Sequence, residues 1–288
     1  MESTVKTSIG TIGILGAGQM GSGIAEVAAH SGLEVMLVDV SKELAEKGKG
    51  RIANGLAKQV ERGSTTAAER DLLLGRIHPT GDIGDLERAD YVVEATTEDQ
   101  SLKQAVFRKI DQAARPGVVL ATNTSSISVT LLGAATRRPE KVIGLHFMNP
   151  VPRMRLVEVV RGLTTDDQTF DVTLELARRF GKMPVTCRDI PGFIVNRILL
   201  PLINEAIYAL YEGLGTAEDI DQAAKLGLNH PLGPLELADL IGLDTCLAIL
   251  NVMHRELGED KYRPCPLLRQ YVAAGWLGRK AGRGFCRY

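Results

Sequence analysis

A glycine-rich turn at residues 16–21 constrains the fold of this chain more than any other stretch. It reads Gly-Ala-Gly-Gln-Met-Gly, follows an apolar segment of strand length at residues 11–15, and precedes residues 22–30, whose apolar side chains recur at helical spacing. Three glycines alone also occur in ordinary loops. A strand, a glycine turn and a helix in this order, however, predict the first unit of a dinucleotide-binding fold.

Each glycine of the turn has a separate use in such a fold. Gly16 allows the tight turn, Gly18 lets backbone N–H groups approach a pyrophosphate, and Gly21 lets the helix pack against the strand. The helix also offers its positive N-terminus to the phosphates. The cofactor-binding residues expected in this turn are Gly16, Gly18, Met20 and Gly21.

The choice of cofactor is predicted by an acidic residue. A second strand, residues 33–38, leads into Asp39, which lies 21 residues beyond Gly18. The dinucleotide fold places there the carboxylate that binds the adenosine ribose diol. This carboxylate would repel the 2′-phosphate of NADP, and the nearest cation in the sequence, Lys42, lies three residues further on. The expected cofactor is therefore NAD(H).

The composition limits the partners that this chain can take. Its 288 residues exceed what one hydrophobic core usually organises, so two domains are expected. The formal net charge is −1, from 34 lysines and arginines against 35 acidic residues. A chain with this balance has no excess of positive charge that would favour binding to nucleic acid or an anionic membrane. We therefore expect a small-molecule partner, without nucleic acid or membrane.

Cysteine usage and the first residues favour a cytoplasmic location. The four cysteines show no CxxC or metal-ligand spacing, so reduced thiols and no metal site are expected. Residues 1–10 lack the apolar core of a signal peptide, and no apolar run is long enough to cross a membrane.

A charged helical segment follows the second strand. Residues 41–74 have helical composition and are broken near residues 63–64, which predicts a helical hairpin where a crossover needs only one helix. Four cations fall along one face of the first helix: Lys47, Arg51, Lys58 and Arg62. They could grip a phosphorylated substrate. Because glutamates are interspersed, spacing alone favours a solvated face.

Strands and helices then alternate, which predicts a parallel sheet. The expected strands are residues 89–95 and 117–121, with a helix at 101–114 between them. Ligands of such sheets lie beyond the carboxyl ends of the strands. Glu98 and the loop at residues 123–126 are therefore expected at the cofactor end.

A histidine and a buried carboxylate are the candidates for proton transfer. His146 ends an apolar strand, and Glu158 stands inside a second apolar strand, residues 156–160, where an unpartnered carboxylate is costly. If the two strands lie side by side, Glu158 can hold one imidazole nitrogen and leave the other to move a proton. The alternative is a satisfied ion pair in the core.

The rest of the chain predicts a second, helical domain. A helix to about residue 180 and a short strand at 183–186 end at the break at residues 189–192. Beyond it the periodicity is helical, at residues 193–214, 217–226, 235–257 and 267–274. We expect domains at 1–190 and 191–288. The first of these helices is apolar almost all round, which predicts a subunit interface.

These features together resemble the 3-hydroxyacyl-CoA dehydrogenase family, most closely its bacterial 3-hydroxybutyryl-CoA members. The motifs that carry the resemblance follow one another along nearly the whole chain, at residues 16–21, 123–126, 146–150, 156–159, 192–197, 229–234 and 277–282. The resemblance implies an α/β fold, with a Rossmann-like dinucleotide-binding domain and a helical C-terminal domain that forms a homodimer. It also implies reversible, NAD-dependent oxidation of an (S)-3-hydroxyacyl-CoA to the 3-ketoacyl-CoA.

The resemblance also assigns catalytic roles to individual residues. His146 matches the general base that removes the hydroxyl proton, and Glu158 matches its partner. Ser125 and Asn196 match residues that hydrogen-bond the reacting oxygen. Asn149 matches the residue that positions nicotinamide and substrate.

The binding residues are carried over in the same way. The positions that match family contacts to the dinucleotide are Asp39, Glu98, Lys103, Asn149 and Lys280. Lys58 matches the family's cation for the CoA moiety, which reverses the solvated-face interpretation of the basic stripe. The expected substrate-binding residues are Lys58, Arg62, Arg51 and Ser125.

This chain departs from the family pattern at two positions that flank the site. Met148 replaces an aromatic residue, and Arg153 stands where an aliphatic residue is common. Because of these two departures, the resemblance does not assign the acyl-chain preference. Two other functions stay open at this point: a dehydrogenase of a free hydroxy acid, as in the gulonate dehydrogenase and lambda-crystallin branch, and a non-catalytic NAD(H)-binding protein.

Overall fold

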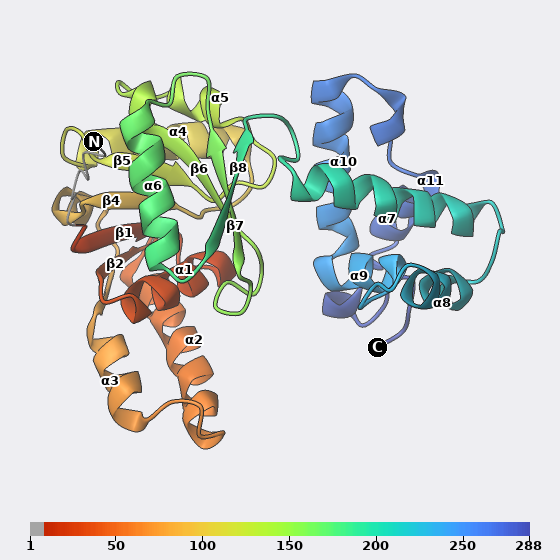
Figure 1. Cartoon of the computed structure of the whole chain (residues 1–288), viewed down its shortest axis with the longest axis horizontal. Helices are drawn as coiled ribbons and strands as arrows, with labels where there is room; N and C mark the ends of the chain where they lie inside the picture. Colours follow the sequence, from red (N-terminus) through yellow and green to blue (C-terminus); the bar gives the residue numbers. More distant parts are fainter. Residues whose placement is uncertain (1–8) are drawn as a thin grey trace, which may run out of the picture. The chain divides into compact units, whose positions relative to one another are not determined.

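The computed structural model describes residues 9–288 (Figure 1). The chain divides into two compact units, one that ends at Asp189 and one from Ile190 to Tyr288. Each unit has its own hydrophobic core. None of the helices in the described part of the chain has the length and apolarity that a bilayer span requires.

The first unit is built on one eight-stranded sheet with the order β3-β2-β1-β4-β5-β6-β7-β8. Its strands are β1 Thr11–Leu15, β2 Glu34–Val38, β3 Ile77–Thr80, β4 Tyr91–Glu94, β5 Val119–Thr122, β6 Val142–Phe147, β7 Leu156–Arg161 and β8 Met183–Arg188. All neighbours are parallel except β6 and β7, which are antiparallel. The parallel sheet expected from the alternation is thus confirmed for all but this pair. Residues 148–155 join β6 to β7 without a crossover helix, so the chain reverses direction there.

Within the described part of the first unit, six α-helices accompany the sheet. They are α1 Gln19–His30, α2 Lys42–Glu61, α3 Ala67–Gly75, α4 Gln100–Ala113, α5 Val129–Gly133 and α6 Asp167–Arg179. Apolar side chains of α1 and α6 share one core with the strands. The glycine turn joins β1 directly to α1, so the first turn of α1 lies at the carboxyl end of β1, where such sheets bind ligands.

The helical hairpin expected after the second strand is present. Figure 1 shows α2 and α3 side by side, extending away from the sheet. Ser41 caps α2, and Thr66 and Glu69 form a capping box that starts α3. Strand β3 was not expected from the sequence, because Pro79 weakens the strand pattern; it is tolerated because β3 is an edge strand. A 3₁₀ segment, η1 Ile83–Arg88, leads from β3 toward β4.

The second unit is all helical, as expected. Its helices are α7 Val195–Tyr211, α8 Ala217–Gly227, α9 Pro234–Ile241, α10 Leu243–Leu257 and α11 Pro266–Ala273, followed by the 3₁₀ segment η4 Arg279–Ala281. The single helix expected at residues 235–257 is wrong. Gly242 has φ 104° and separates α9 from α10, a conformation that breaks a right-handed helix and that glycine adopts without a Cβ penalty.

Candidate active site

The glycine turn has the close contacts that the sequence motif requires. Gly16 has φ 101°, and a Cβ there would lie 2.5 Å from the Ala95 carbonyl oxygen. A Cβ on Gly21 would lie 1.7 Å from the Gly16 carbonyl oxygen, so only glycine lets α1 start against β1. Gly18, the N-cap of α1, faces open space, with nothing within 4 Å of a Cβ. That space, in front of a helix N-terminus, fits a pyrophosphate.

Two charged side chains contact the backbone of Ala17, which lies between Gly16 and Gly18 in the turn. The Asp39 carboxylate accepts a hydrogen bond from the Ala17 N–H at 2.7 Å. The Arg51 guanidinium, from α2, donates to the Ala17 carbonyl oxygen. Arg51 was expected to bind the substrate, which stays a prediction; the structure shows its contact with the cofactor turn. Sequence spacing showed only the helix face that Arg51 shares, not the loop that this face covers.

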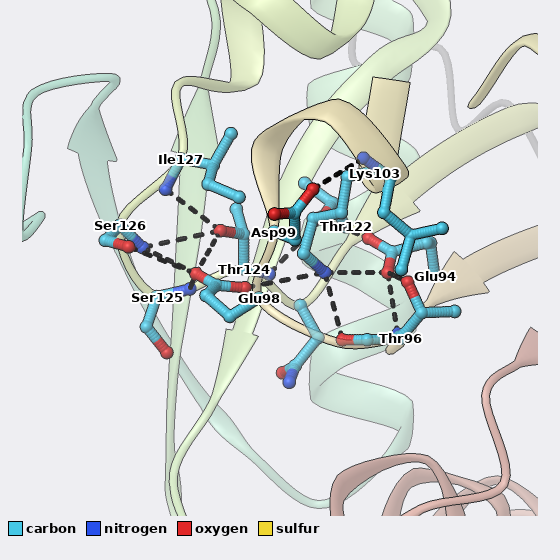
Figure 2. Close-up of polar contacts among 12 residues, drawn as sticks. Glu94, Thr96, Glu98, Asp99, Lys103, Thr122, Thr124, Ser125, Ser126 and Ile127 are labelled. Carbon is cyan, nitrogen blue, oxygen red and sulfur yellow. Dashed lines mark hydrogen bonds and ion pairs between the residues drawn. The ribbon is translucent and has the colours of Figure 1, made fainter. Parts of the chain in front are cut away.

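A buried ion pair lies at the carboxyl end of β4 (Figure 2). The Glu94 carboxylate is fully buried and accepts hydrogen bonds from Lys103 Nζ at 2.7 Å and from the Thr122 hydroxyl at 2.7 Å. Thr96 donates to it through both its N–H and its hydroxyl. Lys103, expected to contact the dinucleotide, is only 1% exposed, so its ammonium is held inside the protein.

Glu98 joins this ion pair to the loop at residues 123–126. One of its oxygens lies 3.5 Å from Lys103 Nζ. The other accepts from the Thr124 hydroxyl at 2.5 Å, from the N–H groups of Ser125 and Ser126 at 2.8 and 3.1 Å, and from the Ser126 hydroxyl. Figure 2 shows these donors gathered around one carboxylate oxygen. Glu98 therefore fixes the backbone that carries Ser125.

His146 and Glu158 face each other across the antiparallel pair β6 and β7. Imidazole Nδ1 lies 2.8 Å from a Glu158 carboxylate oxygen, and both residues are buried. On the other side of the ring, Nε2 lies 3.2 Å from the Ser125 hydroxyl oxygen. A carboxylate, an imidazole and a hydroxyl thus form a continuous line, which can move a proton to or from an oxygen held beside Ser125.

The other expected site residues lie in several places. Asn149 accepts a hydrogen bond from the Gln19 side chain at 3.1 Å, which ties it to the glycine turn. Lys58 lies on the exposed face of α2. Asn196, in the first turn of α7, and Lys280, whose ammonium pairs with Asp244 at 2.6 Å, belong to the second unit. Within residues 9–288 no cluster of His, Cys, Asp and Glu side chains could hold a metal ion.

Sequence reasoning missed two features of this site. One is the burial of Lys103: a lysine on an amphipathic helix is usually exposed, and only the spacing of nine residues from Glu94 hinted at a partner. The other is Gln19, which occupies one of the non-glycine positions of the glycine motif. No sequence signal connects Gln19 to Asn149, which lies 130 residues away.

Two family models together cover nearly the whole chain. Residues 11–190 match the model described as 3-hydroxyacyl-CoA dehydrogenase, NAD binding domain. Residues 192–288 match the model described as 3-hydroxyacyl-CoA dehydrogenase, C-terminal domain. The dinucleotide-binding prediction is thereby confirmed for the first unit.

Individual relatives are similar over nearly their full lengths. A 3-hydroxybutyryl-CoA dehydrogenase of Bradyrhizobium diazoefficiens is 52% identical, over 96% of this chain and 94% of that protein. A 3-hydroxybutyryl-CoA dehydrogenase of Mycobacterium tuberculosis is 46% identical, over 98% of this chain and 99% of that protein. The crystal structure of (S)-3-hydroxybutyryl-CoA dehydrogenase PaaH1 from Ralstonia eutropha is similar with a TM-score of 0.94 and 48% identity, over 98% of this chain and 99% of that one.

Proposed function

The chain belongs to the 3-hydroxyacyl-CoA dehydrogenase family, and from this premise we propose that it catalyses the reversible, NAD-dependent oxidation of (S)-3-hydroxybutyryl-CoA to acetoacetyl-CoA. The observation that carries the proposal is the line from Glu158 through His146 to the Ser125 hydroxyl. This line ends at the carboxyl edge of a sheet whose glycine turn fits a dinucleotide. The names of the relatives supply the substrate.

His146 acts in this proposal as the general base. In the oxidation its Nε2 takes the proton of the 3-hydroxyl group. A bound NAD would supply the acceptor for the hydride that leaves C3. Glu158 holds the Nδ1 side of the ring, which fixes its orientation and stabilises the imidazolium that forms. In the reduction the imidazolium returns the proton to the oxygen.

The neighbouring residues position the reacting groups. The Ser125 hydroxyl, held near Nε2 by the Glu98 contact to its loop, hydrogen-bonds the reacting oxygen. Lys103 acts through Glu98, since its ammonium is buried against two carboxylates. Asp39 binds the adenosine ribose and disfavours NADP. From the resemblance, we propose Asn149 and Asn196 for substrate positioning, Lys280 for the dinucleotide and Lys58 for CoA.

The experiment that tests this function compares the wild-type protein with His146→Gln. We expect kcat for acetoacetyl-CoA reduction to fall by about 10²- to 10⁴-fold, because the proton donor is lost, with NADH affinity nearly intact. The matched control is His78→Gln, which removes a histidine that also pairs with a carboxylate, Glu34, but lies on β3. Near-normal turnover of His146→Gln would remove His146 from the mechanism.

We also propose that the protein forms a homodimer through its second unit. Ile194 and Ile198, at the start of α7, are 37% and 65% exposed, and apolar side chains of this size are usually covered. Sedimentation at micromolar concentration should show a species of twice the chain mass. A single species of monomer mass would contradict the proposal.

A further inference from the structure

Lys182 is a buried lysine of the first unit that lies outside the catalytic line. It follows α6, directly precedes β8 and is only 8% exposed. Burial lowers the pKa of its ammonium group, and no carboxylate of residues 9–288 forms an ion pair with this group. A buried ammonium group without a carboxylate is costly unless hydrogen bonds replace its water. The groups that accept these hydrogen bonds therefore show what Lys182 holds.

The partners of Lys182 are two backbone carbonyl groups of the segment between β6 and β7. Nζ donates to the carbonyl oxygen of Val151 at 2.5 Å and to that of Met154 at 2.9 Å. Both carbonyl groups belong to a tight turn, in which the N–H groups of Arg153 and Met154 donate to the Pro150 carbonyl oxygen. The ammonium group thus joins the two ends of this turn.

The same turn packs closely against α1. Val151 is 2% exposed, and a Cβ on Gly23 would lie 2.8 Å from the Val151 Cβ. Gly23 follows Gly21, the last glycine of the motif, by two residues. The turn is therefore held by the helix that begins at the glycine turn and, through its carbonyl groups, by Lys182.

Asn149 is the candidate site residue that this arrangement places. It lies two residues before Val151, and its side-chain oxygen accepts a hydrogen bond from Gln19 Nε2 at 3.1 Å. Because both Asn149 and Gln19 are exposed, this hydrogen bond competes with water and contributes little by itself. The buried contacts of Val151 constrain the backbone more strongly, and they bring Asn149 to the glycine turn.

We propose that Lys182 is a positioning residue, which binds the carbonyl groups of Val151 and Met154 and so holds Asn149 beside the glycine turn. The inference rests on the proposed function, in which Asn149 positions the substrate. In this role Lys182 contacts no reacting atom and acts on the rate only through Asn149. A displacement of about 1 Å in a positioning group can lower a rate about 100-fold, so the effect of Lys182 on kcat is measurable.

The test is a double-mutant cycle of Lys182→Met and Asn149→Ala. Methionine has a side chain of similar length but no donor for the two carbonyl groups. We expect Lys182→Met to lower kcat for acetoacetyl-CoA reduction about 10- to 100-fold when Asn149 is present. In the Asn149→Ala background the further change should stay within about 2-fold, because the group that Lys182 positions is already absent.

Two further measurements separate positioning from other roles. Lys182→Arg keeps a charged donor and should retain a higher kcat than Lys182→Met. With S-acetoacetyl-N-acetylcysteamine, a thioester that lacks the nucleotide of CoA, Lys182→Met should lower kcat by the same factor. A direct contact of the ammonium group with the nucleotide would instead confine the effect to the CoA ester and to its KM, and would contradict the proposal.

The control is Lys49→Met on α2, which removes a lysine that also donates to a backbone carbonyl group, that of Ile77 at 2.8 Å. Its kcat should stay within about 2-fold of wild type. NADH titration and thermal unfolding show that each variant is folded, and Lys182→Gln replaces Lys182→Met in the cycle if the latter does not fold.

Two results would overturn the inference. One is an equal fall of kcat with and without Asn149, and the other is a loss of thermal stability in Lys182→Met with kcat at the wild-type value. If the wild type does not reduce acetoacetyl-CoA at all, the proposed function fails instead.

Discussion

At the scale of single residues, Asp111 shows how one buried carboxylate ties two segments together. It lies on α4 and accepts hydrogen bonds from the side chains of Arg137 at 2.9 Å and Arg138 at 2.7 Å. Burial alone would raise the pKa of Asp111, but the hydrogen bonds from Arg137 and Arg138 and the charge of Arg138 outweigh it and lower the pKa. The ionised carboxylate therefore stabilises the fold.

We predict that Asp111→Asn lowers the free energy of unfolding by about 2–4 kcal/mol at pH 7, because two arginines lose their counter-ion. A carboxyl group with a lowered pKa stabilises the fold above its unfolded-state pKa, near 3.9, and loses this effect as pH falls through the folded-state pKa. The difference from wild type should therefore shrink from pH 7 to pH 3 in urea unfolding. Asp171→Asn, on the exposed face of α6, is the control. A difference that stays constant over this range would contradict the prediction.

The sequence predicted some of these residue contacts and missed others for a physical reason. Glu158 was predicted beside His146, because a carboxylate inside an apolar strand needs a partner and the neighbouring strand ends in a histidine. The partner of Lys103 was not predicted. A lysine side chain on a helix can adopt many exposed conformations. Only the packing of α4 against the end of β4 selects the buried conformation that pairs with Glu94.

At the scale of elements, the glycine turn joins β1 to α1 with no spare room on its inner side and open space on its outer side. Gly21 faces the inner side, where a Cβ would overlap the carbonyl oxygen of Gly16. Gly18 faces the outer side, where a Cβ would meet no protein atom within 4 Å. Gly21 is therefore needed for the turn to fold, and Gly18 is needed to leave space for the cofactor.

We predict opposite effects for alanine at these two positions. Gly21→Ala should lower the free energy of unfolding by about 1–3 kcal/mol, because the turn must shift to admit the methyl group. Gly18→Ala should leave the stability of the free protein within about 1 kcal/mol of wild type, yet weaken NADH binding about 10-fold or more, because the methyl group takes up pyrophosphate space. Thermal unfolding and NADH titration measure the two effects. A stable Gly21→Ala, or a Gly18→Ala that binds NADH normally, would contradict this assignment.

Most elements were predictable because each carries a local signal. The strand, turn and helix around residues 16–21 and the hairpin of α2 and α3 follow from periodicity and capping. The division into α9 and α10 does not, because Gly242 sits in an otherwise continuous helical pattern. A glycine is tolerated within a helix at about 1 kcal/mol, so the sequence alone does not show that this one adopts a positive φ.

At the scale of the whole molecule, a net charge near zero hides a local concentration of positive charge. The formal charge of −1 excludes a general attraction for polyanions. Arg62 and Arg153 nevertheless line one cavity of the first unit, although they lie 91 residues apart in the chain. This proximity depends on tertiary packing, so the sequence predicted the cations of α2 but not the second segment that lines the cavity with them.

One measurement tests the central claim most directly: the rate of cofactor consumption with acetoacetyl-CoA and with free acetoacetate, each supplied with NADH and with NADPH. We expect rapid loss of NADH with the CoA ester alone, and slow loss of NADPH, because the Asp39 carboxylate repels its 2′-phosphate. Turnover of the free acid alone would contradict the account and indicate a hydroxy-acid dehydrogenase. NADH binding without turnover of either substrate would contradict it as well, and indicate a non-catalytic binding protein.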